Sequence, residues 1–182
     1  MGTIITLYHG SSYDFDVIDL QQGRPYKDFG QGFYTTANIS HAKSMAEKNA
    51  QIRRSKLQRF SSENIHIATW LYQYQFDAKK NTKLAIKKFA EANREWGQFI
   101  TLNRRNKGAS HNYDIVIGPT ANDLTNPTIQ FYMSGGVGEV GSDHAIDELI
   151  RLLEPYRLPS QYFFATERAI DCLKLVRKEQ VL

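Results

Sequence analysis

The chain has 182 residues, of which 41% are hydrophobic and 23% charged, and it carries a formal net charge of +4 and a single cysteine. This composition excludes a disordered chain and an internal disulfide, and the length suffices for one domain, residues 1–182, with a sizeable core. No apolar run approaches the ~20 residues of a membrane span, and no basic region precedes the first apolar residues. We therefore expect a cytoplasmic protein without membrane contact.

Apolar periodicity and turn-forming residues predict strands and helices in irregular alternation. We expect strands over residues 3–8, 32–36, 65–76, 113–118 and 161–166, and a strand or tail over 175–182. We expect helices over residues 40–58, 82–92, 94–106, 127–133, 142–154 and 167–173, with Ser40 and Ser142 as N-caps. This order predicts an α+β fold with a mixed or largely antiparallel sheet.

Positive charge is concentrated in residues 40–107, which contain 15 Lys and Arg residues against 5 Asp and Glu residues. Such a segment is a candidate surface for a polyanion, and nucleic acid is the leading functional interpretation. The alternative is a solvated helix face that needs no partner. It is favoured by the helical spacing of Lys80, Lys83, Lys87 and Lys88.

Two glycines, Gly30 and Gly32, flank one polar residue and lead directly into Phe33-Tyr34-Thr35-Thr36. This pattern predicts a turn with permissive backbone dihedral angles, followed by a short strand that a ligand can approach. Adjacent residues of a strand point to opposite faces, so one of the rings of Phe33 and Tyr34 can serve the core while the other faces a cleft. The structural alternative is a tight hairpin with a buried aromatic residue.

Two further stretches accompany this one: Tyr8-His9-Gly10-Ser11 at the end of the first strand, and Gln161-Tyr162-Phe163-Phe164 near the end of the chain. Taken singly, each has a structural explanation, such as a hydrogen-bonded histidine or a polar residue at a strand edge. The glycines do not predict a Rossmann domain, because the third glycine is missing and the segment opens a strand rather than a helix.

Taken together, these stretches and the strand Asp114-Ile115-Val116-Ile117-Gly118-Pro119 resemble the ADP-ribosyltransferase superfamily, and within it a bacterial family with the same four motifs in the same order. The resemblance implies a pair of split antiparallel β-sheets with flanking helices and a cleft for NAD. It also implies a His-Tyr-Glu triad, onto which His9, Tyr34 and Gln161 fall by position.

The resemblance implies specific roles for these residues. His9 would hydrogen-bond a ribose hydroxyl, the backbone of Gly10 would meet the nicotinamide carboxamide, and the ring of Tyr34 would stack on the cationic nicotinamide. NAD serves as co-substrate and no metal is expected, because the histidines lack ligand spacing. The implied NAD-binding set is Tyr8, His9, Gly10, Ser11, Gly32, Phe33, Tyr34, Thr35 and Thr36.

Gln161 departs from the family pattern, because an amide cannot ionise and so cannot act as a base or offset positive charge. Three explanations are open. The enzyme is a His-Tyr-Gln variant; a nearby carboxylate, Asp123 or Glu167, supplies the charge; or the protein binds NAD without turnover. Asp123 sits in a polar turn, where capping the next helix is an equally good explanation. Glu167 lies at the far end of the predicted strand.

From the resemblance we expect a mono-ADP-ribosyltransferase that moves ADP-ribose from NAD to a macromolecule and releases nicotinamide, and that serves as the toxin of a toxin–antitoxin or phage-defence pair. The basic segment favours RNA or DNA slightly over protein as the acceptor, and an antitoxin protein is a further expected partner. The alternatives are an NAD glycohydrolase and a non-catalytic nucleotide- or RNA-binding module.

Overall fold

The structure is a computed structural model that describes residues 4–60, 64–107, 111–122 and 124–181. The chain divides into two compact units, each assembled from stretches that are separate in the sequence. Unit 1 comprises Met1–Ile18, Tyr34–Thr82 and Ile170–Leu182, and unit 2 comprises Asp19–Phe33 and Lys83–Ala169.

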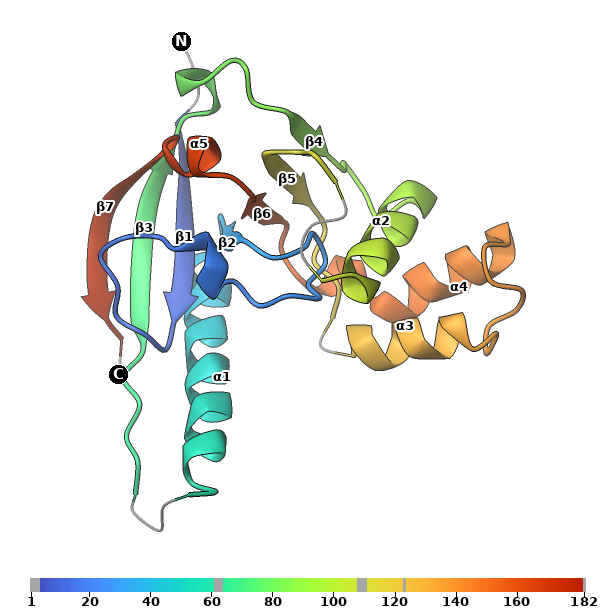
Figure 1. Cartoon of the computed structure of the whole chain (residues 1–182), viewed down its shortest axis with the longest axis horizontal. Helices are drawn as coiled ribbons and strands as arrows, with labels where there is room; N and C mark the ends of the chain where they lie inside the picture. The colour runs from blue at the N-terminus through green and yellow to red at the C-terminus, as the bar shows by residue number, and fades with distance from the viewer. Residues whose placement is uncertain (1–3, 61–63, 108–110, 123, 182) are drawn as a thin grey trace. The chain divides into compact units, whose positions relative to one another are not determined.

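Unit 1 is an antiparallel arrangement of strands with one long helix (Figure 1). The strand order is β2-β1-β3-β7, in which β2 contributes its last three residues to this unit and Phe33 to unit 2. The core is formed by apolar strand residues, including Leu7, Leu71, Tyr72 and Phe76. The elements are β1 (Ile5–Ser11), β2 (Phe33–Thr36), α1 (Ile39–Leu57), β3 (Trp70–Phe76), a 3₁₀ helix (Ala78–Lys80) and β7 (Leu173–Gln180).

Helix α1 packs on β1 through a stripe of small residues, Ala42, Ala46 and Ala50, which are all buried. Residues four apart lie on one face of a helix, so the three alanines allow a close approach of the two backbones. Gly10 is the opposing position on β1: a Cβ there would lie 1.8 Å from the carbonyl oxygen of Ala42. The glycine of the Tyr-His-Gly-Ser stretch is therefore required by packing.

Unit 2 combines three short strands with three packed helices (Figure 1). Strand β5 pairs in parallel with β4 and antiparallel with β6. Its core contains Trp96, Ile100, Ile115, Phe163 and Phe29, all of them fully buried. The elements are 3₁₀ helices at Leu20–Gln22 and Pro155–Arg157, β4 (Ile86–Lys88), α2 (Arg94–Arg105), β5 (Ile115–Gly118), α3 (Thr125–Met133), α4 (Asp143–Leu153), β6 (Gln161–Phe164) and α5 (Glu167–Ile170).

The predicted α+β class is confirmed, and the pairing is mixed because β4 and β5 run parallel. The predicted helix over residues 82–92 is wrong, since this stretch contains β4 and the buried Phe89. Its lysines therefore do not share a helix face, and Lys87 forms an ion pair with Glu95. Pairing with β5 overrides the local helical spacing.

Several boundaries also differ from expectation. Strand β3 begins at Trp70 rather than at residue 65, and α5 ends at Ile170 rather than at residue 173. Helix α1 begins at Ile39, and its N-cap is Asn38, whose side chain accepts a hydrogen bond from the backbone N–H of His41, so the predicted Ser40 cap is wrong. Ser142 caps α4 as predicted. The last predicted segment is strand β7, which begins at Leu173. Among the described residues, no helix combines the length and the apolar character needed to cross a membrane.

Candidate functional site

Antiparallel pairing of β1 with β2 in unit 1 brings together the Tyr-His-Gly-Ser and Tyr-Thr-Thr stretches, with Tyr8 opposite Thr36. The ring of His9 lies 2.7 Å from the backbone of Tyr34, measured from Nδ1 to the carbonyl oxygen. A carbonyl only accepts hydrogen bonds, so Nδ1 carries the proton and donates it to this contact. Two predicted site residues that are 25 positions apart are thus joined directly.

The imidazole of His9 is held in its neutral form. Burial lowers its pKa from 6.5 to about 4, and the hydrogen bond to Tyr34 raises it by a smaller amount. Desolvation penalises the charged imidazolium, which explains the direction. With the proton on Nδ1, Nε2 is the acceptor nitrogen of the ring, the form that suits a hydrogen bond from a hydroxyl.

Two aromatic residues that the sequence analysis did not identify surround His9. Phe15 contacts its ring edge-on at 5.8 Å between centroids, and Phe15 stacks on Tyr72 at 4.0 Å. The Tyr72 hydroxyl accepts a hydrogen bond from the backbone N–H of Phe15. Burial raises the pKa of Tyr72 to about 12, so this hydroxyl stays protonated at neutral pH. The sequence signal for Phe15 was an aromatic residue between two aspartates in a polar loop.

Two residues of the implied NAD-binding set use their side-chain hydroxyls in local turns. Ser11 Oγ accepts a hydrogen bond from the backbone N–H of Tyr13 at 2.9 Å, and Thr36 Oγ1 accepts one from the backbone N–H of Asn38 at 3.2 Å. Such bonds stabilise the chain reversals that follow β1 and β2. Thr35 and Thr36 are buried, whereas Tyr8 is half-buried. These residues have structural roles beside any contact with a ligand.

The adjacent rings of β2 differ in burial as the alternation predicts: Phe33 is 7% exposed, and Tyr34 is half-buried. Both glycines before them have backbone reasons. Gly30 adopts φ 101°, in the left-handed region that favours glycine. A Cβ on Gly32 would lie 2.5 Å from the carbonyl oxygen of Phe164. Unit 2 thus requires glycine at both positions, at Gly30 for the backbone conformation and at Gly32 for the close approach of Phe164.

Gln161 opens β6 in unit 2, and its side chain joins a polar cluster around the buried Asp28, which is 3% exposed. Gln161 Nε2 donates to Asp28 Oδ2 at 2.8 Å and to the carbonyl oxygen of Pro119 at 3.3 Å. The other carboxylate oxygen, Asp28 Oδ1, accepts from Arg104 Nε at 2.9 Å and from Nη2 at 2.6 Å. The backbone N–H of Ala121 completes the shell at 3.3 Å from Oδ2.

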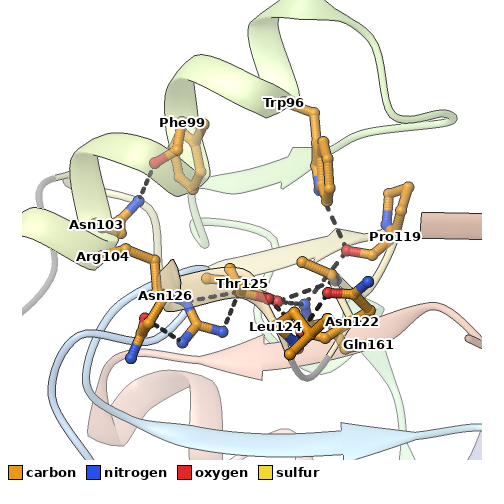
Figure 2. Close-up of polar contacts among 12 residues, drawn as sticks. Trp96, Phe99, Asn103, Arg104, Pro119, Asn122, Leu124, Thr125, Asn126 and Gln161 are labelled. Carbon is orange, nitrogen blue, oxygen red and sulfur yellow. Dashed lines mark hydrogen bonds and ion pairs between the residues drawn. The ribbon is translucent and has the colours of Figure 1, made fainter. Parts of the chain in front are cut away.

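Helix α2 positions the partners of this cluster. Trp96, Ile100 and Arg104 are four residues apart and so lie on one helix face. Trp96 Nε1 donates to the Pro119 carbonyl at 3.2 Å, and Arg104 Nη1 donates to Asn126 Oδ1 at 3.0 Å. Figure 2 shows both side chains pointing from the helix toward the segment after β5. The backbone of this segment turns through Asn122, whose Oδ1 accepts from the backbone N–H of Leu124 at 3.0 Å.

Neither carboxylate proposed from the sequence is seen beside Gln161 in the described residues. Asp123 lies outside the described residues. Glu167 is exposed at the start of α5. The carboxylate that contacts Gln161 is instead Asp28, which sequence reasoning missed, although it directly precedes the Phe29-Gly30 turn. Because 133 positions separate Asp28 from Gln161, no local pattern connects them.

These features define an α+β protein with a neutral, half-buried histidine at a paired strand end and a carboxylate–amide–guanidinium cluster. The chain belongs to the family described as protein of unknown function (DUF3990), which matches residues 5–175. No curated protein matches the chain, and no solved structure does.

Proposed function

We propose that the protein is an NAD-dependent mono-ADP-ribosyltransferase with an ADP-ribosyltransferase-like fold. The observation that carries this proposal is the hydrogen bond from His9 Nδ1 to the Tyr34 carbonyl. It supports the proposal because it joins two of the motifs that carry the resemblance and holds the histidine neutral, with Nε2 as an acceptor for a ribose hydroxyl. The role proposed for Gln161, the third position of the triad, comes from the resemblance.

In this reaction the bond between the nicotinamide nitrogen and ribose C1′ breaks, and nicotinamide leaves as a neutral molecule. The sugar passes through an oxocarbenium-like state, and a nucleophile of the acceptor then bonds to C1′ and loses its proton. The π face of Tyr34 suits the cationic nicotinamide of NAD, and Tyr34 is half-buried, whereas its neighbour Phe33 is buried. Nε2 of His9 would hold a ribose hydroxyl of the same molecule.

A macromolecular acceptor is part of the proposal, with RNA or DNA favoured slightly over protein. The basic residues of the segment 40–107 support it, and among them Lys56 and Arg59, near the end of α1, are exposed. Other members of that segment are engaged internally, such as Arg104 with Asp28 and Arg94 with Asp147. The toxin role and the antitoxin partner are proposed on the family resemblance, and the cytoplasmic location on the amino-acid sequence.

A non-catalytic nucleotide-binding module is the second candidate, and one observation favours it. Gln161 is neutral, and its amide nitrogen already donates to Asp28 and Pro119, so the side chain offers neither a base nor a charge to a reaction. Such a protein would bind NAD or RNA and release no nicotinamide. An NAD glycohydrolase would instead release nicotinamide with water as the only acceptor.

The test is incubation of the purified chain with NAD labelled in its adenylate, alone and with total RNA, DNA or soluble protein, while released nicotinamide and incorporated label are measured. Transfer predicts nicotinamide release together with label in one fraction. Release without label indicates the glycohydrolase. No release from a folded protein under any of these conditions contradicts the enzyme and leaves the binding module.

Two matched pairs of variants locate the site in the same assay. Tyr34→Ala removes the π face, whereas Tyr34→Phe keeps it, so we expect at least about a tenfold loss in the first and little loss in the second. His9→Asn keeps a donor for the Tyr34 carbonyl and removes the Nε2 acceptor, so we expect a folded protein with weakened NAD turnover. Equal activity of all these variants would place the site elsewhere.

A further inference from the structure

The orientation of the Gln161 amide follows from its neighbours. Asp28 Oδ2 and the Pro119 carbonyl are acceptors, so the group of Gln161 that faces them is the NH₂ group. Both contacts therefore use Nε2, and Oε1 accepts no hydrogen bond from the described part of unit 2. The NH₂ group of the amide thus faces the cluster, and Oε1 lies on the other side of the amide group.

We propose that Asp28 is a positioning residue. It holds the amide of Gln161 so that Oε1 is the acceptor presented to a ligand hydroxyl. This inference rests on the proposed function for the identity of the ligand, a ribose hydroxyl of NAD. The carboxylate is itself fixed on all sides, by two bonds from Arg104 and one from the Ala121 N–H. A group held in this way cannot rotate to release the amide.

The same geometry explains why an amide rather than a carboxylate occupies position 161. A glutamate there would place its oxygens against the Asp28 carboxylate and the Pro119 carbonyl, where the NH₂ group now lies at 2.8 and 3.3 Å. The glutamate oxygens would then face other hydrogen-bond acceptors, and two negatively charged carboxylates would share one partly buried site. The cluster thus keeps one carboxylate, at position 28, with Arg104 as its counter-ion.

This arrangement predicts that the carboxylate and the amide can be exchanged between positions 28 and 161. In the double variant Asp28→Asn with Gln161→Glu, the new amide at position 28 can donate to the new carboxylate while its oxygen accepts from Arg104. The cluster again holds one amide, one carboxylate and one guanidinium. The Ala121 N–H loses its acceptor, because it bonds the oxygen that becomes the NH₂ group. We therefore expect partial rather than complete recovery.

The first experiment measures urea unfolding of the full chain for the wild type, Gln161→Glu, Asp28→Asn and the double variant. At about pH 8 we expect Gln161→Glu to lower the midpoint by roughly 1 M, and the double variant to recover at least half of the loss. At about pH 5 the loss in Gln161→Glu shrinks, because a protonated glutamate can donate to Asp28. Among the described residues, Asp28 is the charged group hydrogen-bonded to Gln161, Arg104 is paired with Asp28, and the residues of β5 are uncharged.

The second experiment measures kcat and KM for NAD in nicotinamide release. Asp28→Asn frees the amide, so we expect kcat/KM to fall at least about tenfold. The control is Asp114→Asn, which perturbs another buried carboxylate of unit 2, one bound by Arg168. At equal loss of stability, the control should keep kcat and KM near wild-type values.

The outcomes separate the two proposals. A wild-type chain that releases no nicotinamide overturns the proposed function, and with it the ligand assigned to Oε1. Equal midpoints for the wild type and Gln161→Glu at about pH 8, or a double variant no more stable than Gln161→Glu, overturn the positioning role of Asp28. An Asp28→Asn protein with wild-type kcat/KM overturns it as well.

Discussion

The neutral state of His9 links its environment to the stability of the protein. Its pKa is lowered from 6.5 to about 4 by burial, and the hydrogen bond to Tyr34 offsets only part of that effect. The unfolded chain therefore binds a proton more readily than the folded one. Stability contributed by neutral His9 is complete above the unfolded pKa and is lost as the pH falls from about 6.5 toward 4.

We expect this loss to reach about 2 kcal/mol at about pH 5. The measurement is urea unfolding at about pH 7.5 and pH 5 for the wild type and His9→Asn, which does not titrate. Other groups titrate alike in the two proteins, so the difference between them reports on position 9. Identical losses in both proteins would show that His9 is not held neutral.

Gly10 is a second residue whose identity is set by its surroundings. A Cβ would lie 1.8 Å from the Ala42 carbonyl oxygen and 2.9 Å from the Ala46 backbone nitrogen, and neither atom can move without shifting α1. We expect Gly10→Ala to cost at least about 3 kcal/mol of unfolding free energy, measured by chemical denaturation. The control is Gly97→Ala, whose Cβ would meet a flexible side chain of Ile150 at 3.1 Å. A small effect at both positions would contradict the tight packing of α1 on β1.

The start of α1 offers a test of how the helix is capped. Asn38 accepts a hydrogen bond from the His41 N–H at 2.9 Å, whereas Ser40 lies inside the helix and is exposed. We expect Asn38→Ala to cost about 1 kcal/mol and Ser40→Ala to change the unfolding free energy by a few tenths of that at most. Thermal or urea unfolding distinguishes the two, and a larger effect at position 40 would favour the cap expected from sequence.

The strands of unit 2 are joined by a second buried carboxylate. Asp114 accepts from Arg168, from the Thr166 hydroxyl and from the Ala85 N–H that precedes β4. Burial raises its pKa, but these hydrogen bonds together hold the pKa below its usual value. We expect Asp114→Asn to cost about 2–4 kcal/mol, detected as a lower unfolding midpoint. A neutral effect would mean that β4 is held by its pairing with β5 alone.

For the molecule as a whole, net charge bears on the acceptor rather than on the fold. If RNA is the acceptor, binding should weaken linearly on a logarithmic salt scale, because phosphate contacts release counter-ions. We expect the combined variant Lys56→Ala and Arg59→Ala to reduce the slope by about 1–2, measured by fluorescence anisotropy with labelled RNA. The matched control removes two other exposed cations, Lys174 and Arg177 on β7. Equal effects would indicate non-specific attraction.

Much of this architecture was predictable because the signals are local. The period-2 alternation around Trp70–Phe76 indicated β3, and the apolar spacing and Ser142 indicated α4, since both patterns depend only on neighbours along the chain. The adjacent positions of Phe33 and Tyr34 on one strand likewise predicted that only one of the two rings would serve the core, and the structure buries Phe33. The proposed chemistry of His9 and Tyr34 stays a prediction from their motifs.

Other features depended on contacts between distant parts of the sequence. Residues 82–92 have helical spacing, yet β4 forms there because β5 supplies hydrogen bonds that the isolated segment lacks. Gly10 looked like a residue for a ligand and also proves necessary for α1. Asp28 had no signal at all, because its partners Arg104 and Gln161 lie 76 and 133 positions away. Local patterns thus specify elements and motifs, whereas the environment of each polar side chain is created only when remote segments pack together.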